Sequence, residues 1–286
     1  MGTIRSNFAG SWYPSNSKDC ESAINGFLKD TIIKTPKKME ILGGIVPHAG
    51  WFFSGSIACN VIKYLKENSS IDTIVIFGMH LGTNSPGFIM KEGEWDTPFG
   101  PLTINKKLAS AIIEKFDNLE VSSKYFARDN TIELQLPFIK YFFNDVSIVP
   151  IGAPPDITGL QLGNLIPSIA KDLGNNIKIL GSTDLTHYGY NYGFSPKGSG
   201  KIAYDWVRND NDKEIIDTMM EMNAEKVIEK ALKDQNACCS GAAAAAIASL
   251  KSMGANKTEQ IAYATSYDKS PGDSFVGYVG LVFGKE

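Results

Sequence analysis

The chain has 286 residues, a formal net charge of −3, a pI near 5.7 and 43% hydrophobic residues. This acidic balance, without a long Lys/Arg run, argues against nonspecific nucleic-acid binding, and no stretch approaches the roughly 18 apolar residues of a membrane span. Four cysteines are too few for a disulfide scaffold of this size, which favours a reducing, cytoplasmic setting.

The first part of the chain predicts strands that alternate with helices. Residues 8–14 form an aromatic arm, expected to anchor the N-terminus unless its aromatic rings line a site, and a helix follows at 18–30. The apolar runs at 40–46 and 73–77 predict buried strands, and the helical stripe at 55–65 between them predicts a right-handed βαβ crossover.

The middle of the chain is less regular. Short strands are expected at 88–91 and 102–104, and the aromatic loop at 94–100 between them is expected to form a wall of the site. Helices are predicted at 106–116 and 129–143, the second kinked or restarted by Pro137. A strand at 147–152, a helix at 156–173 and a strand from residue 178 continue the α/β alternation.

The last part predicts mainly helices and then two strands. A long helix is expected at 201–222, another at 224–232, and a small-residue helix at 243–250 that can pack close to its neighbours. Strands at 260–266 and 274–283 are joined by a hairpin-type connection and predict an antiparallel edge. We expect residues 1–286 to form a single α/β domain, with a central mixed, mostly parallel sheet flanked by helices.

Three histidines, the only ones in the chain, share one pattern. His48, His80 and His187 each follow an apolar strand, and a glycine stands two residues later each time. Ligands in open α/β sheets bind beyond the carboxyl ends of the strands, so the three imidazoles are expected to converge. One such histidine alone is more often a turn residue, but the joint pattern favours a site for Zn, Cu, Fe or Ni.

Other polar residues near strand ends are further candidates. Asp184, three residues before His187, is expected either to ligate the metal or to orient a liganding imidazole through its second nitrogen, with the second role favoured. Asp129 or Asn130 serves as a helix cap, whereas Glu133 and Gln135 are not needed for capping and are candidates for the site. Cys238 or Cys239 at a helix N-terminus is either a thiolate near the metal or a small buried residue, which spacing alone favours.

Seven motifs together resemble those of the Memo family, also called AmmeMemoRadiSam system protein B. They are Phe-Ala-Gly-Ser-Trp-Tyr-Pro, Val-Pro-His48-Ala-Gly-Trp, Gly-Met-His80-Leu-Gly, Asn-Thr-Ile-Glu133-Leu-Gln135-Leu-Pro, Ser-Thr-Asp184-Leu-Thr-His187-Tyr, Cys238-Cys-Ser-Gly, and Tyr-Ala-Thr-Ser with Val-Gly-Tyr-Val. The resemblance covers essentially the whole chain in the same order.

This resemblance implies a fold like that of the class III extradiol dioxygenases, with a non-haem metal site. It implies His48, His80 and His187 as the metal-site histidines and Asp184 as a site aspartate, and it selects Cys238 over Cys239 as the nearby thiol. Two positions depart from the family pattern. Asn130 replaces a histidine and cannot titrate near neutral pH, which puts acid–base chemistry in doubt, and Cys239 replaces a glycine and is either an added ligand or a site of oxidation.

The expected function is a metal-dependent redox enzyme, oxygenase-like, acting on an unknown small molecule. Its cofactor is expected to be Fe(II), with Cu or Zn as alternatives, and the candidate catalytic residues are Asp184, Cys238 and Glu133. One alternative is a non-catalytic module that binds a ligand or a phosphopeptide. Another is the partner of an AMMECR1-like protein and a radical S-adenosylmethionine (radical SAM) protein, because the chain lacks the CxxxCxxC motif of the radical enzyme itself.

Overall fold

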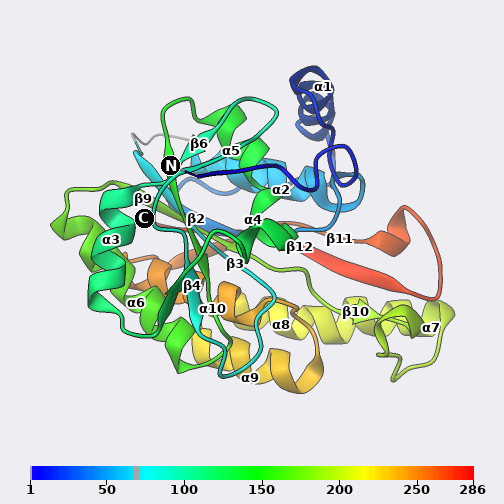
Figure 1. Cartoon of the computed structure of the whole chain (residues 1–286). Helices are drawn as coiled ribbons and strands as arrows, with labels where there is room; N and C mark the ends of the chain where they lie inside the picture. Colours follow the sequence, from blue (N-terminus) through cyan, green and yellow to red (C-terminus); the bar gives the residue numbers. More distant parts are fainter. Residues whose placement is uncertain (1, 67–70) are drawn as a thin grey trace.

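The computed structural model describes residues 2–66 and 71–286. Within these residues a nine-stranded sheet has the order β10-β12-β2-β9-β3-β8-β4-β7, with β11 paired to β12 (Figure 1). Its strands are β2 (Glu40–Val46), β3 (Thr73–Gly78), β4 (Gly87–Ile89), β7 (Leu119–Val121), β8 (Ser147–Gly152), β9 (Ile177–Ser182), β10 (His187–Tyr188), β11 (Lys257–Thr265) and β12 (Phe275–Lys285). A small second sheet joins β1 (Thr3–Ile4), β5 (Glu94–Trp95) and β6 (Leu102–Thr103).

The centre of the large sheet is parallel, as predicted. Strands β2, β9, β3 and β8 lie side by side in parallel register. Strands buried on both faces are near-continuous runs of apolar residues, which is the pattern that the sequence showed. The predicted antiparallel hairpin is present as β11 and β12, although β12 also pairs with β2 and so joins the hairpin to the parallel strands.

Helices cover both faces of the sheet (Figure 1). One face carries α1 (Ser17–Phe27), α2 (Trp51–Leu65), α4 (Asn130–Glu133) and α5 (Leu136–Phe142); the other carries α3 (Lys106–Lys115), α6 (Ile157–Asp172), α8 (Asp212–Met220), α9 (Ala224–Asp234) and α10 (Ser240–Ser252). Because strand residues alternate between faces, Ile74 and Ile76 join the core under α2 while Val75 and Phe77 join the core under α10. Single turns of 3₁₀ helix lie at η1 (Phe126–Arg128), η2 (Tyr190–Tyr192) and η4 (Ser266–Asp268).

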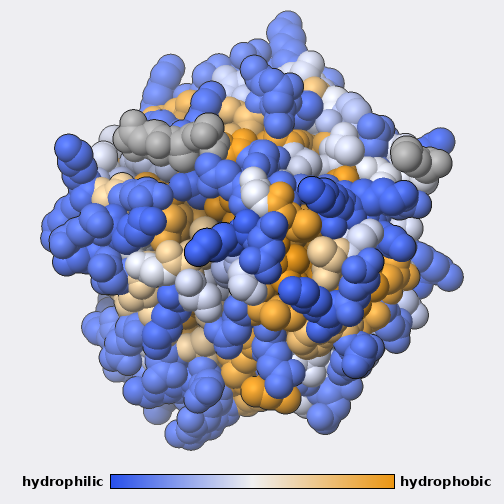
Figure 2. Space-filling view, turned by 90° about the vertical axis from the view of Figure 1, so that its left-hand side faces the viewer, coloured by the Kyte–Doolittle hydropathy of each residue, from blue (hydrophilic) through white to orange (hydrophobic). Residues whose placement is uncertain are grey.

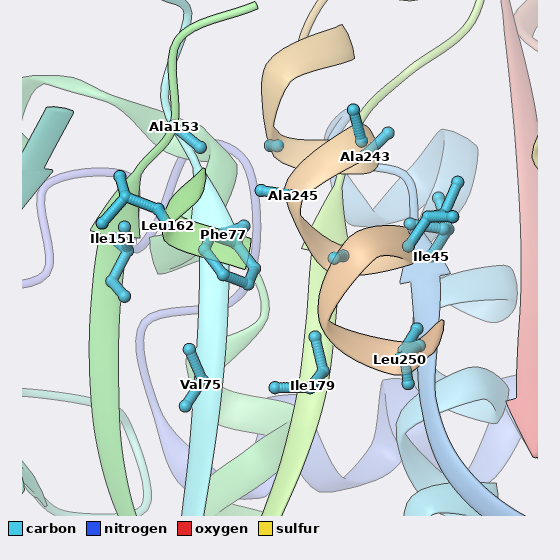
Figure 3. Packing of buried hydrophobic residues seen from close by; sticks show 14 of the residues in the cluster. Ile45, Val75, Phe77, Ile151, Ala153, Leu162, Ile179, Ala243, Ala245 and Leu250 are labelled. Atoms are coloured by element: carbon cyan, nitrogen blue, oxygen red, sulfur yellow. The ribbon is translucent and has the colours of Figure 1, made fainter. Parts of the chain in front are cut away.

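The small-residue helix α10 packs close to its neighbours, as predicted. Figure 3 shows Ala243, Ala245 and Leu250 of α10 beside strand residues Ile45 and Ile179. A Cβ atom added at Gly163 of α6 would lie 2.3 Å from the carbonyl oxygen of Ala245. Only glycine fits there, so the glycine of one helix and the alanines of the other together set the close approach of the two helices.

The helix predicted at 201–222 is divided in the structure. It forms α7 (Gly200–Trp206), a π-helical turn η3 (Val207–Asn211) and then α8. Asn211 and Asp212, at the end of this turn, bind the hydroxyl of Thr186 inside the protein. The helix predicted at 129–143 does restart, as expected, with Pro137 in the first turn of α5.

The aromatic loop at 94–100 does not line the cavity that borders His48, His80 and His187, so the prediction that it forms a wall of the site is wrong. Trp95 is fully buried and packs edge-on against Phe126. The aromatic arm takes the place of this loop, because Ser11 and Trp12 line the cavity.

The surface alternates between polar and apolar regions. Figure 2 shows polar and charged side chains over most of one face, with smaller apolar areas between them. Among the described residues, no helix combines the length and the apolar character that crossing a membrane requires.

Candidate metal centre

The histidine-bearing loops meet at one edge of the sheet. His48 follows β2, His80 follows β3, and β9, which leads to Asp184 and His187, lies between these two strands. Because the strands are parallel, their carboxyl ends open into the same crevice. The rings of His48 and His80 consequently lie edge to face, with their centroids 5.1 Å apart.

Hydrogen bonds fix the tautomer of His48. Its ring is 2% exposed, and Nδ1 lies 3.1 Å from the hydroxyl of Ser182. Ser182 donates its own proton to the carbonyl of Thr131 at 2.7 Å, so its oxygen accepts from His48 Nδ1–H. The lone pair of Nε2 is left free, and Nε2 lies 3.3 Å from the sulfur of Cys238.

The ring of His80 is oriented in the same way by a carboxylate. His80 Nδ1 lies 2.9 Å from Oδ2 of Asp129, and the His80 backbone N–H donates to the same oxygen. Asp129 also caps α4, so a single side chain performs both tasks. Met79, the preceding residue, has φ +73°, in the left-handed region that costs a residue with a side chain about 1–2 kcal/mol. The surrounding structure therefore holds the backbone strained at Met79, directly before His80.

The start of α10 brings two thiols to these rings. The backbone N–H of Cys238 donates to the carbonyl of Asp184, which ties this turn to the end of β9. Cys238 and Cys239 have their sulfurs 3.8 Å apart. One ligand atom from each of His48, His80, Cys238 and Cys239 lies within 4.8 Å of the other three.

The charges around this group favour a cation. Burial lowers the pKa of His80, but the hydrogen bond to Asp129 and the nearby Cys238 outweigh it and raise that pKa to about 10. Burial raises the pKa of Cys238, but the Cys239 thiol and the imidazoles around it hold it well below the usual value. The Asp129 carboxylate and the Cys238 thiolate, which hold protons on the imidazoles, also attract a metal ion, and the ion can replace those protons.

Asp184 and His187 lie beside the group of four. Asp184 Oδ1 accepts the backbone N–H of His48 at 2.7 Å, and Oδ2 lies 3.9 Å from Nε2 of both His48 and His187. Asp184 therefore lies near the His48 nitrogen that faces Cys238, and Ser182 contacts the other ring nitrogen. Nε2 of His187 is buried without a hydrogen-bond partner.

A cavity of about 650 Å³ opens next to these residues. His48, His80, Asp184 and His187 lie on its wall together with aromatic residues. The lining is completed by Ser11, Trp12, Ala49, Gly50, Phe52, Phe53, Asn130, Tyr192, Ser266, Ser270, Ser274, Val276 and Tyr278. None of these lining residues is Lys or Arg. The cavity therefore offers aromatic surfaces and hydroxyl groups beside an electronegative donor cluster.

Glu133, a predicted catalytic residue, lies outside this cavity wall. Its fully buried carboxylate accepts hydrogen bonds from the backbone N–H groups of Asn7 and Phe8 and from the hydroxyl of Tyr13. Burial raises the pKa of Glu133 while these three donors lower it, and the net direction is upward. Glu133 thus ties the aromatic arm to α4, which holds Trp12 at the cavity.

Asn130 and Gln135 support the loop that carries His48. The Asn130 amide donates to the carbonyl of His48 at 2.9 Å, and the Gln135 amide donates to the carbonyl of Pro47 at 2.9 Å. Of the two, only Asn130 lines the cavity. No pattern in the sequence indicated the contact of Ser182 with His48 or that of Asp129 with His80, because both contacts join segments distant along the chain.

The donor set fits a transition metal. Two imidazoles have their Nδ1 atoms occupied and their Nε2 atoms available, as is usual for metal-ligating histidines whose other nitrogen is hydrogen-bonded. Imidazole and thiolate ligands suit Zn, Cu and Fe better than they suit Mg or Ca. The fold and the site therefore define an α/β protein with a candidate transition-metal centre at the carboxyl ends of its central strands.

Comparison with known proteins agrees with the motifs. The family model described as Memo-like protein matches residues 5–282. A MEMO1 family protein of Pyrococcus furiosus is 31% identical over 98% of this chain and 99% of its own length. One from Pyrococcus horikoshii is 32% identical over 96% of this chain and 97% of its own. The chain belongs to the Memo family.

Proposed function

We propose that this protein is a metal-dependent redox enzyme that acts on a small organic molecule. His48, His80 and Cys238 hold a transition-metal ion, and His187 is the third imidazole of the centre. One observation carries this proposal: two imidazoles of fixed tautomer and a thiol meet within 4.8 Å, beside a cavity. A bound redox metal supplies one-electron chemistry and an electrophilic centre for oxygen or substrate.

The protein's own residues prepare this site. Ser182 and Asp129 hold the Nδ1 protons of the two histidines, which leaves both Nε2 atoms available to the ion. Asn130 fixes the His48 loop from the cavity side, but its amide carries no titratable proton, so proton transfer at this position is not part of the proposal. The aromatic wall offers a surface for a planar or apolar substrate.

The identity of the ion follows from the donors only in part. The family resemblance implies Fe(II), and imidazole also suits Cu and Zn. We therefore propose Fe(II) as the redox cofactor, with Cu or Zn as alternatives.

Metal content tests the centre directly. We expect protein purified without chelator to carry about one equivalent of transition metal, and His48→Ala and Cys238→Ala to lose most of it, because each removes a ligand. Elemental analysis measures this loss. Cys59→Ala is the matched control, since Cys59 is a buried cysteine of α2 outside the donor group. Full metal retention in both His48→Ala and Cys238→Ala would contradict the proposal.

Turnover separates the enzyme from a non-catalytic module that binds a ligand or a phosphopeptide. The metal-loaded enzyme consumes oxygen or a reductant in the presence of substrate, whereas a binding module does not. The cavity lining has no Lys or Arg to pair with a phosphate, which favours the enzyme. The partnership with AMMECR1-like and radical SAM proteins is a separate proposal, and co-purification from the native host tests it.

A further inference from the structure

Cys239 brings a second sulfur to the candidate metal centre. Its side chain is 3% exposed, and Cys239 is the N-cap of α10. Its sulfur lies 3.8 Å from that of Cys238 and within 4.8 Å of one ring nitrogen on each of His48 and His80. A small buried residue in the core would need only to fill space, whereas this sulfur also lies within reach of three other donors.

The separations of the donors resemble those of a four-coordinate site. Bond lengths of about 2.3 Å for Zn–S and about 2.0–2.1 Å for Zn–N give a tetrahedron with edges of about 3.8 Å between sulfurs and about 3.5 Å between sulfur and nitrogen. The two sulfurs lie 3.8 Å apart, and Cys238 Sγ lies 3.3 Å from His48 Nε2. Side-chain shifts of about 1 Å would bring the longest separation, at most 4.8 Å, to a tetrahedral edge.

The backbone holds both cysteines in place from the end of β9. The N–H of Cys239 donates to the hydroxyl oxygen of Thr183 at 3.1 Å, and that hydroxyl donates to the carbonyl of Asp184. The N–H of Cys238 donates to the same carbonyl. Consecutive side chains of an extended strand point in opposite directions. At the turn into α10, by contrast, the two sulfurs lie near each other.

We infer that Cys239 is the fourth ligand of the ion, which makes the centre a four-coordinate site with two sulfur and two nitrogen donors. Two thiolates with two imidazoles form a Cys₂His₂ set, whose donors suit Zn, Cu and Fe better than Mg or Ca. This inference rests on the proposed metal centre and specifies its donor set. It also makes Cys239, rather than His187, the residue that completes the first four donors.

Cobalt(II) is the spectroscopic probe that counts the sulfurs. The reduced full-length protein is freed of metal and titrated with Co(II) without oxygen. The near-ultraviolet thiolate-to-cobalt absorption of Cys239→Ala and of Cys239→Ser should then be about half that of the parent, because one of two thiolates is absent. Removing a residue that only hydrogen-bonds to a metal ligand lowers metal affinity by about 10- to 100-fold. Removal of a ligand should cost at least as much, so we expect Zn(II) to bind Cys239→Ala at least about tenfold more weakly.

The controls separate this inference from the proposed function. Cys59→Ala should keep the full absorption and the parent Zn(II) affinity, and thermal unfolding of Cys239→Ala, measured without metal, checks that the variant is folded. If Cys239→Ala binds Co(II) with the parent intensity, Cys239 is not a ligand, while the proposed centre stands. If His48→Ala also keeps the parent spectrum and affinity, the proposed centre fails as well. X-ray absorption of the Zn(II) protein should show two sulfur and two nitrogen neighbours, and a single sulfur would overturn the inference.

Discussion

Two buried polar clusters lie along the loop that joins β9 to β10, and they differ in how their atoms are paired. At Asp184 the loop borders the donor group, where two thiols and one ring nitrogen from each of two histidines lie within 4.8 Å of one another. Two residues later, Thr186 enters a second cluster, in which Asp212 accepts from the Thr186 N–H and hydroxyl and from the hydroxyl of Tyr263. Both clusters contain a fully or almost fully buried carboxylate.

The second cluster is satisfied from within. Asn211 donates to Thr186, and a Cβ atom at Gly277 would collide with the carboxylate of Asp212, so the residues pack directly against one another. Beside the donor group, by contrast, Nε2 of His187 is buried without a hydrogen-bond partner. Buried polar atoms are normally paired, so the comparison separates a cluster whose groups satisfy one another from one whose unpaired atoms suit the proposed metal ion.

The largest expected effect concerns Asp212 and the pH dependence of stability. Burial raises the pKa of Asp212 to about 6, against an ordinary value of 3.8, while its hydrogen-bond donors lower it. Because the folded protein binds this proton more tightly than the unfolded chain does, the resulting stability is complete below about pH 4 and is lost as the pH rises through about 6. Each unit of pKa difference between the two states corresponds to about 1.4 kcal/mol. Asp212→Asn should therefore remove about 3 kcal/mol of pH-dependent unfolding free energy between pH 4 and 7.

Urea unfolding of both proteins across this range measures the difference, because carboxyl groups common to the two proteins cancel. We expect metal affinity at neutral pH to be little changed in Asp212→Asn, since Asp212 makes its hydrogen bonds to Thr186 and Tyr263 and not to a residue of the donor group. Parallel stability curves for the two proteins would show that Asp212 does not titrate as proposed.

The second effect concerns Asp129 and sharpens the distinction between capping and positioning. Asp129→Asn keeps the size of the cap but removes the charge that faces His80 Nδ1, so Zn(II) affinity should fall by about 10- to 100-fold. Isothermal titration calorimetry measures the affinity. Asp156→Asn is the matched control, because Asp156 caps α6 through the N–H of Thr158 and has no contact with a histidine among its hydrogen bonds. Equal affinities for the two variants would show that Asp129 only caps α4 and does not position His80 for the metal.

The smallest effect concerns Glu133, which the sequence placed among the catalytic candidates. Glu133→Gln leaves one of its three donors without a good acceptor and should cost about 1–2 kcal/mol of unfolding free energy. Hydrogen exchange at the amides of Asn7 and Phe8 should accelerate, because the arm is held less firmly. Metal affinity should stay at the parent value. A loss of metal as large as that of His48→Ala would show that Glu133 contributes to metal binding.

The sequence by itself determined the order of the elements and the edge of the sheet where chemistry is expected. Apolar runs such as 40–46 and 147–152 coincide with β2 and β8, since a strand buried on both faces needs an unbroken apolar sequence. The small residues of α10 predicted its close packing for an equally local reason. The positions of His48 and His80 followed from the rule that parallel strands end at a common edge.

Only the tertiary structure decided what each polar side chain contacts. Asp129 and Ser182 fix the imidazoles from segments 49 and 134 residues away along the chain, and no local pattern records such pairs. The same holds for Glu133, whose partners Asn7, Phe8 and Tyr13 lie at least 120 residues away near the N-terminus. Cys239 gains its proposed metal-binding role only because the turn into α10 places two adjacent thiols beside two rings. Periodicity reports burial and element type, whereas the pairing of donors and acceptors depends on how distant segments pack.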